Sequence, residues 1–466
     1  MKLTLQELLN ATGGRLLSGV DSSHGGARSI QGRVFEGIST DSRSVRPGDL
    51  FIAIRGERYD GHDFLGAAFR KGASGAVVHR NIRYNGRVLV RVNDTLRALG
   101  DLAAHWRSRH FIPIAAITGS NGKTTTKEMM AGILTSAGYR VLKTEGNLNN
   151  LIGVPLMLFR LGPKTETAVL ELGTNRFGEI DRLTEISMPQ VGIITSIGMA
   201  HLQFFKSLRG VARAKAELLR GLTRDDAAVL NADDPYVVEI GRKCPARKVF
   251  FGFRKGSHVR CVSAKDKGIA GTSVSVDVLG RRMGLDVPLP GLHNVSNALA
   301  AIAGACALDD GVSRSEIQEG LRSRAKIPGR FRIIRKKGFV IIDDTYNANP
   351  CSMEAALRTI CSLKGSARGV AVLGDMLELG REEGRAHEEL GRLVASLGLE
   401  FVIAIGKNAR RVRSGALSGG MSGESFRLAR SHEEAVRIAG DFLKRRDWVL
   451  VKGSRGMHME KVIEGI

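Results

Sequence analysis

Cysteine, aromatic residues and long apolar runs are all scarce in this chain, and each scarcity narrows what it can be. The 466 residues include only five cysteines, far apart and without a Cys-x-x-Cys pair. Such spacing argues against a disulfide framework or a zinc site and predicts a reducing, cytoplasmic environment. No apolar run approaches the roughly 18 residues of a membrane-spanning helix. The N-terminal stretch contains Glu7 and lacks a basic-then-apolar layout, so we expect a first helix there rather than a signal peptide.

Acidic residues are the minority charge, since 70 Lys and Arg oppose 47 Asp and Glu and leave a net charge of +23. A basic surface attracts polyanions such as nucleic acid, anionic lipid or phosphorylated small molecules. The basic residues are scattered, however, and aromatic residues make up only 5%, so no stacking platform for single strands is visible. We expect no specific nucleic-acid partner and no membrane partner. A generally basic proteome or a nucleotide-linked anionic substrate is the plainer account of the charge.

The chain is too long for one ordinary core, and its apolar strand-like runs alternate with helical stretches, which is typical of α/β proteins. We predict three domains, at residues 1–90, 91–327 and 328–466. They are a small N-terminal α/β domain, a central domain with a parallel sheet, and a C-terminal Rossmann-like α/β domain. A helix at Asn93–Arg109 and a strand at Ile112–Thr118 are expected to open the central domain.

The strand Ile112–Thr118 runs directly into GSNGKTTT, and the helical sequence KEMMAGILTSAG follows. A Gly-rich turn between a strand and a helix cradles phosphate, because its N–H groups and the helix N-terminus attract anions. Lys123 can neutralise the β- and γ-phosphates, and the Thr124 hydroxyl can bind Mg²⁺. The usual pattern has another Gly five places before Gly122, where this chain has Ile117. The loop is therefore a shortened one; a plain turn is the alternative, which the flanking strand and helix oppose.

The short loop TGSNGKTT resembles that of the Mur ligase superfamily, which includes the folylpolyglutamate synthetases. Ten further segments that match the family follow in the expected order over nearly the whole chain. They are GNLNNLIGVP (146–155), ELGTNRFGEI (171–180), ITSIGMAHL (194–202), ARAKAELL (212–219), NADDP (231–235), GLHNVSNALAAIA (291–303), PGRF (328–331), DDTYNANP (343–350), GDMLELG (374–380) and VKGSR (451–455). GNLNN, DDTYNANP and GDMLELG look like the branch that adds D-alanyl-D-alanine, whereas the amino-acid-adding branches carry His-containing sequences in place of YNANP. One departure is QFFKS at 203–207, where the family often has a Gly-bearing acidic stretch.

The resemblance implies an ATP-dependent ligase that adds D-alanyl-D-alanine to a UDP-N-acetylmuramoyl-tripeptide for peptidoglycan synthesis. A carboxylate does not react with an amine at neutral pH, because oxide is a very poor leaving group. The ligase therefore forms an acyl phosphate from ATP, which the amine attacks, and ADP and phosphate are released. The resemblance also implies two Mg²⁺ ions. We expect a cytoplasmic monomer.

Three residues are expected to hold the metal together with Thr124. Glu171 ends the strand-like TAVLEL, where ligands bind in parallel α/β sheets, and the resemblance makes it a Mg²⁺ ligand. The same resemblance directs His201 to the second Mg²⁺. It implies that Lys215 reacts with CO₂ to give a carbamate, a reaction that Arg213 cannot undergo. The alternatives are that Glu171 is a solvated carboxylate at a strand end, that His201 is a packed histidine and that Lys215 is a solvated helix lysine. The predicted catalytic residues are Lys123, His201 and Lys215.

The remaining predicted residues bind the nucleotide or the peptide substrates. Asn294, or its neighbour His293, is expected at the adenine unless it only caps a helix, and closure of the third domain is expected to bring its residues to the γ-phosphate and ribose. The predicted ATP-binding residues are Thr118, Gly119, Ser120, Asn121, Gly122, Lys123, Thr124, Thr125, Asn294, Arg330, Asp344, Tyr346 and Asn347. The predicted substrate-binding residues are Ser39, Thr40, Asp41, Ser42 and Arg43 for UDP, Asn147, Asn149 and Asn150 for the muramoyl peptide, and Arg455, with Lys452, for the dipeptide carboxylate.

Several other functions stay open at this point. A sibling ligase would add a single amino acid, or glutamate to a folate. A nucleic-acid-binding ATPase should carry an Asp-rich strand and a basic channel, and neither is clear in the sequence. A family member that only binds should have lost Lys123, Glu171 or Lys215, and all three are present.

Overall fold

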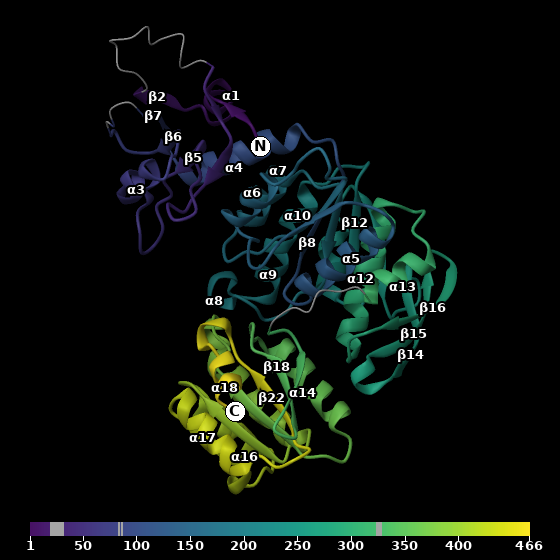
Figure 1. Cartoon of the computed structure of the whole chain (residues 1–466). Helices are drawn as coiled ribbons and strands as arrows, with labels where there is room; N and C mark the ends of the chain where they lie inside the picture. The colour runs from purple at the N-terminus through teal and green to yellow at the C-terminus, as the bar shows by residue number, and fades with distance from the viewer. Residues whose placement is uncertain (19–31, 83, 85–86, 323–328) are drawn as a thin grey trace.

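The computed structural model describes residues 1–18, 32–82, 84, 87–322 and 329–466. Three α/β parts follow one another along the chain (Figure 1), as the α/β class with three domains predicted. The expected boundary between residues 327 and 328, with Pro328, lies outside the described residues. In the described part of the chain, no helix is both long and apolar enough to cross a membrane.

The first domain is built on a five-stranded sheet in the order β2-β7-β6-β5-β4, parallel except for β2. Helix α1 (Leu5–Thr12) begins after Thr4, which forms a capping box with Glu7 and satisfies two otherwise unpaired backbone donors. The expected first helix is thus confirmed. The other elements are β1 (Leu3–Thr4), β2 (Arg15–Ser18), β3 (Val34–Phe35), β4 (Gly37–Ser39), β5 (Asp49–Ile52), η1 (Gly61–Phe64), α3 (Leu65–Arg70), β6 (Gly75–Val78) and β7 (Val88–Arg91).

Helix α4 (Thr95–Ser108) confirms the helix expected at Asn93–Arg109 and joins two cores. Leu99 packs in the core of the first domain, and Trp106 packs in the central core. Asp94 caps the helix by accepting from the N–H groups of the first turn. The predicted boundary at residue 90 therefore precedes a helix that both domains share.

The central sheet has nine strands in the order β16-β15-β14-β13-β12-β11-β8-β10-β9. All neighbours from β9 to β14 are parallel, and β15 and β16 extend the sheet as antiparallel strands that the sequence did not predict. The parallel strands end at one edge, where ligands bind in such sheets. The strands are β8 (Ile114–Thr118), β9 (Val141–Lys143), β10 (Thr167–Glu171), β11 (Val191–Ile194), β12 (Ala227–Asn231), β13 (Arg247–Gly252), β14 (Val259–Asp266), β15 (Thr272–Val278) and β16 (Arg281–Val287).

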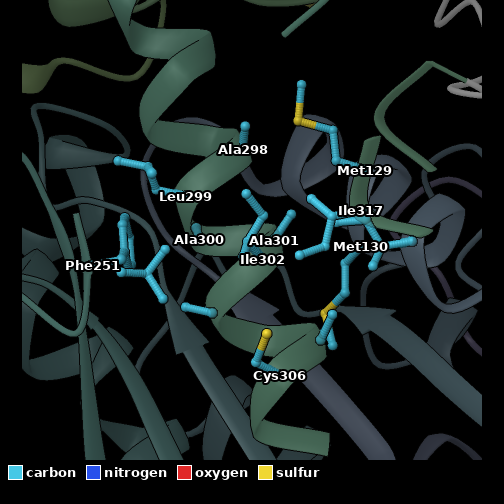
Figure 2. Close-up of a cluster of buried hydrophobic side chains, with 14 of the residues drawn as sticks. Met129, Met130, Phe251, Ala298, Leu299, Ala300, Ala301, Ile302, Cys306 and Ile317 are labelled. Carbon is cyan, nitrogen blue, oxygen red and sulfur yellow. The ribbon is translucent and has the colours of Figure 1, made fainter. Parts of the chain in front are cut away.

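Helices cover both faces of the central sheet. Figure 2 shows Met130, Ile302 and Ile317 meeting in a buried cluster on one face, beneath α5, α12 and α13. The remaining helices lie against the other face or in the loops at its edge. The helical elements are α5 (Lys123–Ser136), α6 (Gly153–Leu158), α7 (Glu179–Ser187), α8 (Leu202–Phe205), α9 (Leu208–Lys215), α10 (Glu217–Arg220), α11 (Pro235–Gly241), η2 (Gly268–Ala270), α12 (Leu292–Leu308) and α13 (Arg314–Arg322).

The third domain has a six-stranded sheet in the order β17-β18-β22-β19-β20-β21, parallel except for β17. The four strand-like runs expected here are confirmed as β18, β19, β20 and β22. The elements are β17 (Arg332–Lys336), β18 (Phe339–Asp344), α14 (Pro350–Lys364), β19 (Gly369–Gly374), η3 (Gly380–Glu382), α15 (Glu383–Ser396), β20 (Phe401–Ile405), α16 (Ala409–Ser418), η4 (Gly423–Ser425), β21 (Phe426–Ala429), α17 (His432–Phe442), β22 (Trp448–Lys452), η5 (Arg455–Met457) and α18 (Glu460–Gly465).

Candidate active site

A cavity of about 710 Å³ lies where the carboxyl ends of the central strands meet the third domain. It brings together residues that are far apart in the sequence and that the sequence had singled out. The predicted residues that line it are Ser120, Asn121, Gly122, Lys123, Thr124, Thr125, Asn149, Asn150, Glu171, His201, Lys215, His293, Asn294, Arg330, Asp344, Tyr346, Asn347 and Lys452.

Two glycines shape the phosphate loop, because at both positions φ is positive and a β-carbon would collide with a neighbouring side chain. Gly119 has φ +152°, and a β-carbon there would lie 1.9 Å from Thr195 Oγ1. Gly122 has φ +82°, and its β-carbon would lie 2.1 Å from Asn297 Oδ1. The sequence predicted a helix from Lys127 onward, but α5 already begins at Lys123, because Gly122 itself occupies the capping position. The lysine and the threonine of the loop therefore stand on the first turn of the helix, where its dipole favours anions.

Two cationic side chains meet at this loop. Lys123 Nζ donates to the Gly119 carbonyl at 2.8 Å. Burial and the charge of Arg330 lower the pKa of Lys123, although Glu171 acts in the opposite direction. The Arg330 guanidinium lies over the Tyr346 ring, 4.0 Å from its centroid, and its buried Nε has no hydrogen-bond partner among the described residues. The pair provides positive charge with spare donors for an anionic ligand.

Glu171 is the last residue of β10, as expected, and is only 2% exposed. One carboxylate oxygen accepts from the Thr124 hydroxyl at 2.7 Å, and the other accepts from the Asn149 amide at 2.9 Å. Burial alone would raise the pKa of this carboxyl, but Lys123, Arg330 and these two hydrogen bonds hold it below its ordinary value. Glu171 is therefore a buried carboxylate that favours its ionised form beside the loop.

Lys215 ends α9 and is buried at 2% exposure rather than solvated. Its Nζ makes no hydrogen bond within the described ranges. Burial, followed by the charge of Lys123, holds the pKa of Lys215 well below its ordinary value, although Glu217 and Glu171 oppose them. The surroundings thus favour a neutral amine at this position, in the cavity wall.

His201 lies in a left-handed conformation, with φ 55°, just before α8. Its ring lines the cavity, and its Nδ1 lies 2.5 Å from Glu378 Oε2 of the third domain. The side chain is thus held by a carboxylate from another domain, a partner that the sequence did not predict.

The third domain brings a polar network to the cavity. Lys452 Nζ contacts Asp344 Oδ2 at 2.5 Å and donates to the Asn347 carbonyl at 2.9 Å. The Asn349 amide donates to Asn121 Oδ1 of the phosphate loop at 2.8 Å. These bonds place the end of β18 and the start of α14 directly against the loop.

Asn294 and His293 lie at the start of α12, but Asn294 does not cap the helix as one alternative proposed. The residue at the N-cap position is Gly291, and Asn294 stands inside the helix. Its amide donates to the Pro290 carbonyl at 2.8 Å and its oxygen accepts from Asn297. Burial lowers the pKa of His293 to about 4, so the ring is neutral near pH 7. The side chains of His293, Asn294 and Asn297 all line the cavity.

A second cavity, of about 520 Å³, lies between the first and central domains. Ser39, Ser44 and Arg46 line it from the first domain, and Leu148 and Arg160 line it from the central one. Of the predicted UDP-binding segment only Ser39 lines this cavity. The lining residues do not include Thr40, Asp41, Ser42 and Arg43.

Asp41 and Arg43 instead bind one another. Their side chains form a salt bridge at 2.7 Å, and the hydrogen bonds from Arg43 lower the pKa of Asp41 to about 2.

Four other predicted residues do not line the first cavity. Thr118 is fully buried and donates to the Leu172 carbonyl, and Gly119 shapes the loop from behind. Asn147 is exposed on the GNLNN loop. Arg455 is exposed, and its guanidinium contacts Glu460 at 3.1 Å. The roles of Asn147 and Arg455 stay predictions.

Sequence reasoning assigned no role to Asn349, Glu378, Thr144 and Lys127. Thr144 accepts from the Glu171 N–H at 2.9 Å, and the buried Lys127 Nζ contacts the Thr144 carbonyl at 2.5 Å. Asn349 lies in the motif DDTYNANP and Glu378 in the motif GDMLELG. Membership of these motifs was the sequence signal that could have pointed to them. Their partners come from other elements, so no local spacing could reveal them.

Comparisons with known proteins agree with this arrangement. Three family models match: the Mur ligase family catalytic domain at residues 34–107, the Mur ligase middle domain at 117–305 and the Mur ligase glutamate ligase domain at 329–455. The chain belongs to the Mur ligase family. It is 35% identical to the UDP-N-acetylmuramoyl-tripeptide–D-alanyl-D-alanine ligase of Bacillus subtilis (strain 168), over 93% of both chains.

Solved structures of MurF ligases superpose on most or all of this chain. The crystal structure of MurF from Acinetobacter baumannii matches with a TM-score of 0.90 at 34% identity, and the match covers 100% of this chain and 98% of that one. MurF ligase from Thermotoga maritima in complex with ADP matches with a TM-score of 0.81 at 28% identity, over 92% of this chain and 96% of that one.

Proposed function

We propose that this protein adds D-alanyl-D-alanine to a UDP-N-acetylmuramoyl-tripeptide with ATP as co-substrate, forming an acyl phosphate and releasing ADP and phosphate. One structural observation carries the proposal. The segment Leu148–Ile152 lies between the two cavities, because Leu148 lines the second and the residues from Asn149 to Ile152 line the first. A long substrate can therefore bind its anionic nucleotide end at the first domain and present its peptide carboxylate to the phosphate loop. The relatives named as such ligases, and the relative bound to ADP, support the same reaction.

The residues of the first cavity suit phosphoryl transfer to a carboxylate. Lys123, Arg330 and the N-terminus of α5 stabilise charge on the γ-phosphoryl group as it moves. The neutral His293, with Asn294, forms a buried polar pocket for the base. Asn349, bound to Asn121, keeps the third domain over the loop, which excludes water from the acyl phosphate.

Two Mg²⁺ ions suit this donor set. Glu171 is an ionised buried carboxylate, and Thr124 and His201 are the other side chains that would hold the ions. Bound Mg²⁺ neutralises the triphosphate and orients it. We propose that Lys215 completes the set as a carbamate: its neutral Nζ attacks the carbon of CO₂ and an N–C bond forms, one C=O π bond opens and leaves its electron pair on oxygen, and Nζ loses one proton to solvent. The neutral amine thereby becomes an anion with two hard oxygens that can bind Mg²⁺. The burial of Lys215, and the lack of a hydrogen bond to its Nζ among the described residues, suit this reaction.

The reaction is tested by phosphate release from ATP in the purified protein. Turnover should require both the UDP-linked tripeptide and D-alanyl-D-alanine and should fall to background when either is omitted. D-alanine and L-amino acids replace the dipeptide in the control reactions. If a free amino acid supports turnover as well as the dipeptide does, the protein is a sibling ligase and the proposed acceptor is wrong.

A further inference from the structure

The segment in which this chain departs from the family, Gln203–Ser207, lies in and after α8 and begins at a junction between the central and third domains. The Gln203 N–H donates to the Glu378 carbonyl at 2.9 Å. The Glu378 side chain reaches the other way, so that its Oε2 lies 2.5 Å from His201 Nδ1. Glu378 belongs to the GDMLELG segment between β19 and η3. One residue of the third domain therefore holds both the backbone of α8 and the side chain that precedes it.

The backbone on both sides of this junction is unusual. His201 has φ 55° and Glu378 has φ 65°, a left-handed conformation that residues with a β-carbon rarely adopt. Such strained residues persist where their surroundings over-determine them, and they cluster at functional sites. A β-carbon on Gly380 would lie 3.1 Å from the Gln203 Cα. The glycine thus permits the close approach of the two domains.

The contact between Glu378 and His201 can orient the imidazole ring. His201 Nδ1 is buried and makes no hydrogen bond of ordinary geometry with any described residue, so the Glu378 carboxylate is the acceptor at hand. A carboxylate at one ring nitrogen fixes the tautomer and the orientation of an imidazole and frees the other nitrogen for a ligand. His201 also lines the cavity. The contact therefore links the orientation of a cavity residue to the position of the third domain.

We propose that Glu378 is a positioning residue, which orients His201 for the nucleotide cavity only while the third domain is docked on α8. The inference deepens the proposed function and rests on it, since His201 is taken to face the metal-bound nucleotide. The site is then complete only when the third domain is docked. A nucleotide bound while that domain is undocked meets a His201 side chain that is not oriented.

The test compares Glu378→Gln and Glu378→Ala with Glu382→Gln, which changes an exposed glutamate of η3. Within the described part of the chain, the Glu382 side chain makes no hydrogen bond or ion pair with the central domain. Mn²⁺ serves as the probe, and its affinity is measured by electron paramagnetic resonance in the presence of ADP. Removing a carboxylate that supports a histidine ligand typically lowers metal affinity about 10–100-fold. We expect a loss of this size in Glu378→Ala, a smaller loss in the nearly isosteric Glu378→Gln, and none in the control. The radius of gyration with ADP and Mn²⁺ should stay that of the wild type.

A double-mutant cycle with His201→Ala decides whether Glu378 acts through the ring. In that background Glu378→Ala should change the Mn²⁺ affinity by less than about twofold. Equal losses in both backgrounds, an unchanged affinity in Glu378→Ala, or a loss accompanied by a larger radius of gyration would each overturn the proposal. The Mn²⁺ measurement contains no peptide substrate. A failure of dipeptide-dependent turnover would therefore count against the proposed reaction and not against this role of Glu378.

Discussion

Lys127 and Lys215 are both buried near the phosphate loop, but they differ in the hydrogen bonds and ion pairs that their amino groups make. Lys127 is 1% exposed, forms an ion pair with Glu128 at 2.8 Å, and contacts the Thr144 carbonyl. Lys215 is equally buried but has no hydrogen bond among the described residues, and its pKa falls well below the ordinary value because of burial. The first lysine braces the strand end that positions Glu171. The second has a lowered pKa and, among the described residues, lacks such partners, as the proposed carbamate requires.

Replacing Lys215 tests the carbamate directly. Lys215→Ala should abolish ligation, and acetate or formate should restore part of it, because a small carboxylate in the vacated space supplies anionic oxygens. Lys215→Arg should stay inactive, since a guanidinium keeps its charge and does not take up CO₂. The rate of phosphate release is measured with increasing concentrations of each acid.

Arg209→Ala provides the matched control, because this basic residue lies on the same helix, away from the cavity lining. It should keep wild-type activity and show no response to the acids. An active Lys215→Arg variant, or a failure of rescue in a Lys215→Ala protein that still binds ATP and Mg²⁺ normally, would remove the carbamate role.

The positions of residues in the phosphate-binding motif, and of Glu171 at a strand end, could be predicted because a local strand–turn–helix pattern sets where they lie, while their roles stay predictions. Lys123 and Thr124 follow the end of β8, and Glu171 ends β10, as the sequence predicted. Glu378 could not be predicted, since its partner lies in another domain. Arg455 was chosen because its charge suits a carboxylate, but the carboxylate it meets in this structure is Glu460.

At the level of elements, strong alternation of apolar strands and helices predicted β8, β10, β18 and α4 correctly. Strands β15 and β16 were missed, although Val274, Val276 and Val278 alternate with polar residues, a pattern that is typical of an antiparallel strand with one buried face. The turn between them contains Leu279 and Gly280, both with positive φ, as tight hairpins require. Leucine is a poor marker of such a turn, so the local signal was weak.

The packing of α13 on α5 offers a test of how firmly the phosphate loop is supported. A β-carbon on Gly320 of α13 would lie 2.3 Å from the backbone of Ile133 in α5. Gly320→Ala must push the two helices apart, and overpacking of this kind costs about 1–3 kcal/mol of unfolding free energy. We expect a lower melting temperature together with a higher KM for ATP.

Gly440→Ala is the control for this substitution, because Gly440 lies in α17 and a β-carbon added there would meet no described neighbour within 4 Å. Alanine favours a helix over glycine by about 1 kcal/mol, so the melting temperature should rise or stay unchanged. Equal behaviour of the two variants would show that α5 and α13 tolerate separation.

At the scale of the whole molecule, the basic charge is spread over the chain, and two separate cavities each contain basic residues that suit an anionic substrate. Lys123 of the phosphate loop and Arg330 of the third domain line one cavity, and Arg46 and Arg160 line the other. The third domain touches the central one through polar contacts such as Asn349 to Asn121 and Ser362 to Asp266. Polar interfaces between domains resemble transient protein–protein interfaces, so we expect the third domain to move relative to the central one.

Substrates should therefore change the shape of the protein in solution. We expect ATP plus the UDP-linked tripeptide to lower the radius of gyration measured by small-angle scattering, because the triphosphate bridges Lys123 of the central domain and Arg330 at the start of the third. Lys123→Ala is the control, since it removes the cation of the loop and should reduce the compaction at the same ligand concentration. If the radius of gyration of the wild type stays unchanged under saturating ligands, the third domain is already docked in the free protein, and closure is not the step that assembles the site.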